Sequence, residues 1–109
     1  YYASRGLGDV YKRQEPNYAT IRDGAWQDGS PYHVIHRMAC AVRGQGIAAR
    51  CMAWCLEQDR HLRVDTHRDN IPMQRLLLRF GFRPVGTVFV EDGTPRIAFE
   101  HSDSFSTKQ

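Results

Sequence analysis

The chain has 109 residues, of which 41% are hydrophobic and 25% are charged, and its formal net charge at pH 7 is +3. This length and composition fit one small globular domain with a modest core and exclude a two-domain protein. No apolar run approaches the roughly 20 residues of a membrane-spanning helix, and the first residues lack the layout of a secretory signal. We therefore expect a cytoplasmic protein without a membrane partner.

Most of the positive charge comes from an N-terminal segment that we exclude from the fold. Residues 4–14 resemble one reading frame of a transposase adapter used to prepare DNA sequencing libraries, and we expect residues 1–14 to be non-native or disordered. Without them the formal net charge is +1. A nucleic-acid-binding module is therefore the less favoured alternative, and we expect no nucleic-acid partner.

The predicted elements follow a loop at residues 15–31, which is rich in turn-forming Asn, Asp, Gly, Ser and Pro. Residues 32–40 are rich in β-formers and predict a central strand. From Gly46 to Gln58 apolar residues recur at helical spacing, which predicts a helix with one buried stripe. Residues 62–67 alternate between apolar and polar side chains and predict a short strand.

A second helix and a hairpin complete the predicted domain. The helix lies between Asn70, which can cap its start, and Gly81, which can end it. Residues 82–90 and 96–100 predict two strands joined by a turn, and we expect the tail, residues 102–109, to be mobile. This order of elements predicts an α/β fold, with a mixed sheet, two helices and a C-terminal β-hairpin.

The turn between the first predicted strand and the first helix can bind an anion. Glycines let a ligand approach the backbone closely, and the first turn of a helix presents unpaired N–H groups to a phosphate. A tight turn without a ligand is the structural alternative. The residues concerned are Arg43, Gly44, Gln45, Gly46, Ile47 and Ala48.

Arg43, Gly46 and Ala48 match the signature Gln/Arg-x-x-Gly-x-Gly/Ala. The chain thereby resembles the GNAT superfamily of N-acetyltransferases, in which this signature binds acetyl-CoA. The resemblance covers residues 18–100 and implies that residues 15–101 form the C-terminal part of a GNAT domain. A complete domain has further strands and two helices before this part, so we expect an N-terminally truncated domain.

A bacterial subgroup of the superfamily shares three further motifs with the chain. Val-Ile-His-Arg occupies residues 34–37, and Asp-Thr-His-x-Asp-Asn-x-x-Met-Gln occupies residues 65–74. Asp-Gly-x-x-Arg-x-Ala occupies residues 92–98. The resemblance to this subgroup implies a bacterial acetyltransferase.

The resemblance also implies contacts with acetyl-CoA as co-substrate. Residues 43–48 would bind its pyrophosphate, mainly through backbone N–H groups. In GNAT proteins the fourth and fifth strands part and pantetheine lies between them, which places Met38, Ala39 and Cys40 along the pantetheine arm. Asn70 matches a position that often contacts the coenzyme, although capping a helix would explain this residue equally well.

The implied reaction is direct attack of an amine on the thioester. His36 and His67 are candidate bases because histidine titrates near neutral pH, and Asp65 can orient His67 or hold a substrate ammonium. A water relay can replace a base. The superfamily's usual general acid is a Tyr seven positions after the Asn, and here that position is Leu77, which cannot donate a proton.

Leu77 and the absent front half of the domain keep a second interpretation open, a non-catalytic CoA-binding module of the same fold. The expected acceptor of an active enzyme is a small-molecule or peptide amine, and a homodimer is left open.

Cysteines and histidines do not predict a metal site. Cys40, Cys51 and Cys55 are an odd number without zinc spacing, and the last two lie one helical turn apart. We therefore expect buried thiols without a disulfide. His33 and His36 point to opposite faces of one predicted strand, so they cannot converge on one ion.

Overall fold

The computed structural model describes residues 11–12, 16–35 and 45–108. Their elements in chain order are β1 (Tyr11–Lys12), the 3-10 helix η2 (Pro16–Ala19), β2 (His33–Ile35), α2 (Gln45–Gln58), β3 (Leu62–Thr66), α3 (Ile71–Arg79), β4 (Arg83–Phe89), β5 (Pro95–His101) and the 3-10 helix η3 (Asp103–Lys108). The predicted α/β class is confirmed, with both predicted helices and the C-terminal hairpin in place.

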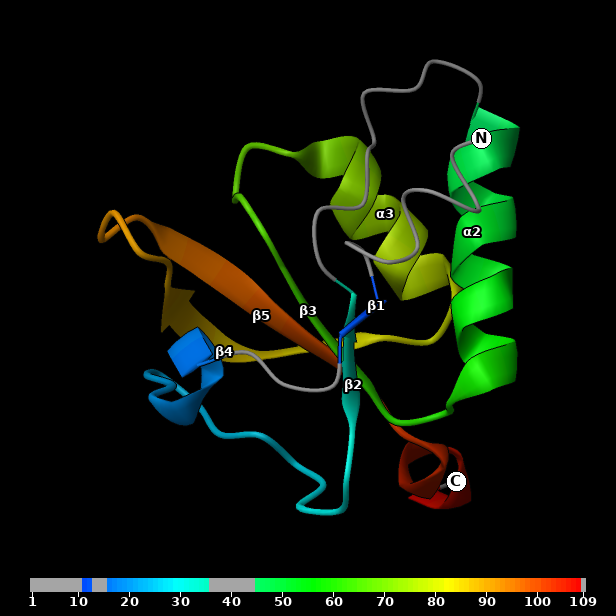
Figure 1. Ribbon diagram of the computed structural model, residues 1–109, viewed down its shortest axis with the longest axis horizontal. Helices are drawn as coiled ribbons and strands as arrows, with labels where there is room; N and C mark the ends of the chain where they lie inside the picture. The colour runs from blue at the N-terminus through cyan, green and yellow to red at the C-terminus, as the bar shows by residue number, and fades with distance from the viewer. Residues whose placement is uncertain (1–10, 13–15, 36–44, 109) are drawn as a thin grey trace.

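The sheet is mixed, with strand order β1-β2-β3-β5-β4 (Figure 1). β2 and β3 are parallel, with His33 opposite Leu62 and Val34 opposite Arg63. The other pairs are antiparallel, and β5 lies between β3 and β4. Because β2 and β3 run in the same direction, the helices that follow them begin at the same edge of the sheet.

The limits of α3 follow from local chemistry, as predicted. The Asn70 side-chain oxygen accepts a hydrogen bond from the Met73 N–H at 3.2 Å, and Pro72 lies in the first turn, where no N–H partner is needed. The helix ends at Arg79, and Gly81 adopts a φ of +91° that disfavours other residues.

Both helices pack on one face of the sheet, which we call the helix face. Its apolar cluster consists of Ile35, Met52, Cys55, Leu56, Leu62, Val64, Met73, Leu77, Phe82 and Phe99. Cys51 and Cys55 are buried free thiols, as predicted. Ile47, which we expected in the buried stripe of α2, is 37% exposed. It lies in the first turn of α2, and the buried stripe begins at Cys51.

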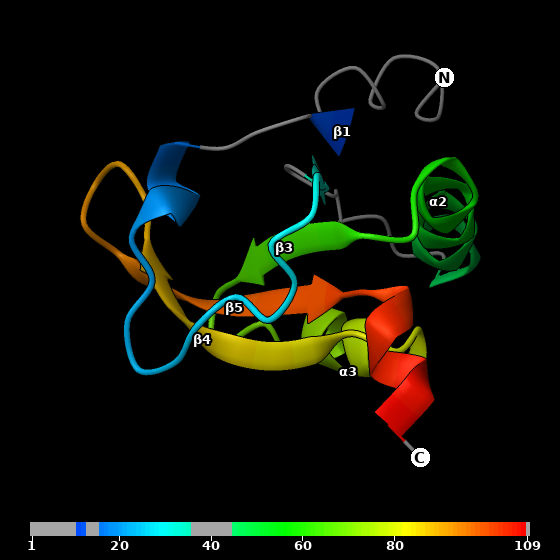
Figure 2. The same ribbon diagram turned by 90° about the horizontal axis from the view of Figure 1, so that it is seen from below.

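The opposite face of the sheet, which we call the loop face, is covered by residues 16–32 (Figure 2). Tyr18, Val34, Val88 and Ala98 form its apolar cluster. Arg22 exchanges two backbone hydrogen bonds of 2.8 Å with Thr87, so this segment also extends the edge of β4. The close approach requires Gly86, because an added Cβ there would lie 2.8 Å from the Ile21 side chain.

The hairpin turns at Gly93, which has a φ of +87°, and β4 contains an irregularity between Pro84 and Gly86. After β5, where we expected a mobile tail, the chain forms η3 with Phe105 buried. The Arg83 guanidinium lies 4.5 Å from the Phe105 ring centroid and donates to the Phe105 carbonyl at 3.2 Å. Phe105 therefore helps to anchor this segment, together with the ion pair of 3.0 Å between Asp103 and Arg60.

Candidate functional site

Part of the predicted site lies outside the described residues. This applies to one candidate base, to the expected pantetheine contacts and to the first half of the glycine turn. The residues are His36, Met38, Ala39, Cys40, Arg43 and Gly44.

The described half of the glycine turn forms the start of α2, which begins at Gln45. Gly46 and Ile47 are exposed and Ala48 is half-buried. An added Cβ at Gly46 would have one neighbour within 4 Å among the described atoms, the Arg50 Nη1 at 3.8 Å. The described side of the helix start is therefore open at Gly46, and the first N–H groups of a helix have no partner within the helix.

Arg50 is a residue of the candidate anion site that the sequence analysis did not identify. Its position on α2 lies away from the predicted buried stripe, and the side chain is exposed. Arg50 follows Gly46 by one helical turn, so its guanidinium reaches back beside the glycine. The spacing of four residues between Gly46 and Arg50 could have predicted this proximity from the sequence. The start of α2 thus combines the N–H groups and positive dipole end of a helix terminus with an exposed cation, Arg50.

Asn70 lies at the same edge, at the start of α3 (Figure 1). The predicted capping role is confirmed, and it uses only the side-chain oxygen. The Nδ2 group is a second, separate donor that is suited to an acceptor atom of a ligand. The contact of Asn70 with a coenzyme stays a prediction.

Asp65 joins two side chains on the loop face. One carboxylate oxygen accepts a hydrogen bond from the Tyr18 hydroxyl at 2.7 Å, and the other accepts from the Arg96 Nη1 at 3.0 Å. Asp65 and Arg96 belong to two of the shared motifs, so the fold brings these motifs into contact. Tyr18, which the sequence indicated only as an apolar anchor, is 2% exposed and contributes a polar contact as well.

His67 follows β3 and is partly exposed. Its Nδ1 accepts a hydrogen bond from the Asp69 N–H at 3.0 Å. In the neutral ring the hydrogen is then on Nε2, which makes this nitrogen a donor. A base would need the lone pair that Asp69 already occupies, so His67 can accept a proton at Nδ1 only after this contact breaks. The described hydrogen bonds of Asp65 lead to Tyr18 and Arg96 and do not include His67.

Leu77, at the position of the superfamily's usual acid, is fully buried in the helix-face cluster. It is therefore a core residue and supplies no proton.

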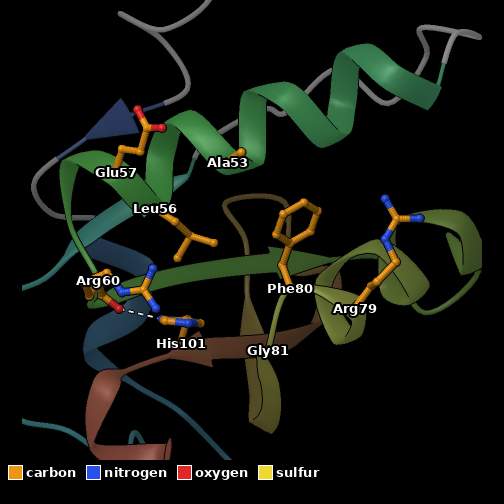
Figure 3. Close-up of a pocket in the computed structure, with 8 residues that line it drawn as sticks. All are labelled: Ala53, Leu56, Glu57, Arg60, Arg79, Phe80, Gly81 and His101. Carbon is orange, nitrogen blue, oxygen red and sulfur yellow. Dashed lines mark hydrogen bonds between the residues drawn. The ribbon is translucent and has the colours of Figure 1, made fainter.

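A pocket lies at the other ends of the two helices (Figure 3). Its volume is about 790 Å³, and it is lined by Ala53, Leu56, Glu57, Arg60, Arg79, Phe80, Gly81 and His101. The pocket begins at Ala53 on α2, seven residues or about 10 Å along the helix from Gly46. It contains no predicted site residue. Burial and the nearby Arg60 charge lower the pKa of His101, whose Nδ1 contacts the Arg60 carbonyl at 2.6 Å.

A buried ionic cluster holds residues 27–32 against the loop face. Glu100 is fully buried, and its carboxylate accepts from the Gln27 N–H at 2.6 Å and contacts His61 Nε2 at 2.7 Å. It also lies 3.4 Å from the Arg63 Nε. The Arg63 guanidinium lies 3.9 Å from the Tyr32 ring centroid. These partners satisfy each other, which indicates a structural role.

Two pKa values in this cluster are displaced from their usual ranges. Burial opposes the charged form of His61, but its contacts with Glu100, with the Pro31 carbonyl and with the Asp28 charge outweigh this effect and raise its pKa. Hydrogen bonds from the Ser102 and Ser30 side chains hold the pKa of Asp28 well below its usual range. Both groups are therefore stabilised in their charged forms.

Among the described residues, no set of three or more His, Cys, Asp or Glu side chains could hold a metal ion. No described helix has the length and apolar character needed to cross a membrane.

Comparison with known proteins gives matches among solved structures. The chain is similar to a GNAT-family acetyltransferase from Streptococcus agalactiae, with 27% identity and a TM-score of 0.66 over 84% of this chain and 54% of that chain. The fold is that of part of a GNAT acetyltransferase. A candidate GNAT-family acetyltransferase from Bordetella pertussis matches with 26% identity and a TM-score of 0.49, over 75% of this chain and 52% of that chain.

The chain spans about half the length of these two solved structures. No protein-family model and no curated protein matches it. The Streptococcus structure supports a fold of the GNAT superfamily for the described residues.

Proposed function

We propose that the chain is the coenzyme-binding part of an N-acetyltransferase that transfers an acetyl group from acetyl-CoA to an amine. The observation that carries this proposal is the open start of α2 at Gly46 within a GNAT fold. The same edge of the sheet carries Asn70 at the start of α3.

The start of α2 fits a diphosphate. Its exposed first turn offers backbone N–H groups, and the Arg50 guanidinium can move onto a bound anion. A helix terminus contributes roughly 0.3–1 kcal/mol per anionic contact through its dipole. A diphosphate makes several such contacts, and a guanidinium adds paired hydrogen bonds. The absence of acidic residues from the first turn of α2 removes a source of repulsion.

The described residues fit direct transfer, in which the amine nitrogen attacks the thioester carbonyl and the carbon–sulfur bond then breaks. Acetyl-CoA supplies the activated acetyl group. The amine proton passes to water, or to His67 after its contact with Asp69 breaks. A thiol has a pKa of about 8.5, so a thiolate can leave without a strong acid. Burial of Leu77 is therefore compatible with turnover.

The burial of Leu77 is also the observation that favours the second candidate, a non-catalytic CoA-binding module of the same fold. Release of free thiol from acetyl-CoA in the presence of a panel of amines distinguishes the two. The enzyme releases thiol at a rate that depends on the amine, whereas the non-catalytic module binds acetyl-CoA without releasing thiol.

Binding of acetyl-CoA tests the proposed site directly. Calorimetric titration of the chain is expected to show saturable binding that Arg50→Gln weakens about tenfold, because a charged hydrogen-bond donor is lost. Arg79→Gln is the matched control, since Arg79 is an exposed arginine at the far end of α3. Equal weakening by both substitutions would show a non-specific charge effect and would contradict the proposed site.

A further inference from the structure

Arg96 has a polar atom whose partner is missing from the described residues. Its Nε is buried and makes no hydrogen bond there. At the other end of the guanidinium, Nη1 donates to Asp65. The side chain as a whole is 34% exposed. A buried N–H without a partner is costly, and such groups in native proteins call for an explanation.

Asp65 fixes the orientation of this guanidinium. Its second oxygen is occupied by the Tyr18 hydroxyl, and Tyr18 is packed in the loop-face cluster. Asp65 therefore cannot rotate freely, and it holds Arg96 by the Nη1 group alone. The Nε–H and Nη2 groups are left side by side. Two parallel N–H donors of this kind match the two oxygens of a carboxylate.

The position of Arg96 on β5 places its Nε–H and Nη2 groups near the proposed reaction site. Ile97 pairs with Thr66, the last residue of β3. Arg96 precedes Ile97, and His67 follows Thr66, so both lie one residue beyond the same pair. Asn70, at the start of α3, follows shortly after. Arg96 is thus at the same edge of the sheet as the proposed coenzyme site, and its contact with Asp65 places it on the loop face.

From these contacts we infer that the acceptor carries a carboxylate next to its amine, as an α-amino acid does, and that Arg96 binds this carboxylate through Nε–H and Nη2. This inference rests on the proposed acetyl transfer. Arg96 is then a specificity-determining residue, and Asp65 and Tyr18 are positioning residues that orient it. Amines without a carboxylate leave the Nε–H unpaired and bind more weakly.

The test compares L-alanine with L-alaninamide, which has the same amine and side chain but no carboxylate. Both are titrated into the ¹⁵N-labelled chain, with and without CoA, while the Arg96 Nε–H signal and the backbone amides are recorded by NMR. L-alanine is expected to bind at least about tenfold more tightly than the amide. It is also expected to shift the Arg96 Nε–H signal, which L-alaninamide leaves in place.

Two variants distinguish a loss of carboxylate binding from a loss of folding. Arg96→Lys keeps the charge but loses the paired donors, and the double variant Asp65→Asn/Arg96→Gln removes both charges together, so that neither is left uncompensated. Both are expected to keep a folded amide spectrum and to lose the preference for L-alanine. Arg79→Gln is expected to keep the preference in full.

The outcomes distinguish this inference from the proposed function. If CoA shifts the amides at the start of α2 while the two ligands bind equally, the carboxylate assignment is wrong and acetyl-CoA binding stands. If L-alanine is preferred but CoA has no effect on α2, Arg96 is an anion receptor unrelated to acetyl transfer, which overturns the assignment of an acceptor site. A preference that survives in the Arg96→Lys variant also overturns it.

Discussion

The two faces of the sheet bury different kinds of side chain. The helix face buries an apolar cluster contributed by α2, α3 and the sheet, and it includes Met52, Leu62 and Leu77, which are all fully buried. The loop face buries only a small apolar cluster around Tyr18, and beside it lie charged groups such as Arg63 and Glu100. Both faces are well packed, but for different physical reasons.

The two faces therefore contribute to stability in different ways, and only the loop face fixes the orientation of polar side chains. The helix face is held by apolar burial, which is non-directional. The loop face is held by paired charges and hydrogen bonds, which require specific partners. Asp65 and Arg96 belong to the second kind, so the same construction that attaches residues 16–32 also orients polar groups near the proposed reaction site.

The largest expected effect comes from breaking the ionic cluster of the loop face. Glu100→Ala removes the fully buried carboxylate that His61 and Arg63 share. We expect the free energy of unfolding to fall by about 3–5 kcal/mol. Urea denaturation measures this change. The control Glu91→Ala removes an exposed carboxylate and is expected to stay within about 0.5 kcal/mol. A similar small effect for both variants would show that the cluster adds nothing to stability.

A cavity in the helix face is expected to cost slightly less. Leu77→Ala removes a fully buried side chain, and the free energy of unfolding is expected to fall by about 2–5 kcal/mol. Its neighbour on α3, Leu78, is 56% exposed, so Leu78→Ala is expected to change it by less than about 0.5 kcal/mol. Denaturation of both variants under one condition gives the comparison. Equal losses would contradict the assignment of Leu77 to the core.

The two buried histidines are expected to give opposite pH dependences. The raised pKa of His61 means that its contribution is fully present below its unfolded pKa of about 6.5 and is lost as the pH rises through the folded pKa. The lowered pKa of His101 gives a contribution that is present above about 6.5 and is lost as the pH falls.

Single substitutions separate these two contributions. In His101→Gln the free energy of unfolding is expected to decrease between pH 6 and pH 8, because the raised pKa of His61 remains and the lowered pKa of His101 is removed. In His61→Gln it is expected to increase over the same range. Urea denaturation at several pH values measures both slopes. Slopes of the same sign in the two variants would show that one of the two environments is assigned incorrectly.

Gly46→Ala, at the start of α2, is expected to give the smallest change in stability among the substitutions in the two faces and the proposed site. An added Cβ at Gly46 meets no close neighbour, and alanine favours a helix over glycine by about 1 kcal/mol, so Gly46→Ala is expected to raise the free energy of unfolding by up to that amount. The added methyl group lies where a diphosphate would approach the backbone, so affinity for acetyl-CoA is expected to fall. A variant that is both more stable and unchanged in coenzyme affinity would contradict the proposed site.

Local patterns in the sequence predicted the helix face well. Asn70, Pro72 and Gly81 determine the limits of α3 through contacts within a few residues, and Met73 and Leu77 lie on one side of it because of helical spacing. The same spacing predicted the buried side of α2 apart from its first turn. These features depend on neighbours along the chain, which a sequence displays directly.

Local sequence patterns could not predict the side-chain pairs of the loop face. His61 and Glu100 are 39 positions apart, and Tyr18 and Asp65 are 47 apart, so their pairing depends on the complete fold. Alternation in β3 indicated that Arg63 lies on the polar face of the strand, but not that Trp26 and Tyr32 would pack against it. At the site, motifs predicted the glycine turn and Asn70, whereas the position of Arg50 beside Gly46 and the pairing of Arg96 with Asp65 depend on the folded structure.

The central claim is that the start of α2 binds the diphosphate of acetyl-CoA, and mapping of amide chemical shifts during a titration with acetyl-CoA tests it most directly. We expect large, saturable shifts at Gly46, Ile47 and Ala48, smaller shifts around Asn70 and none at Gly93 in the hairpin turn. Unchanged amides at the start of α2, or shifts confined to the pocket around Leu56, Phe80 and Gly81, would contradict it.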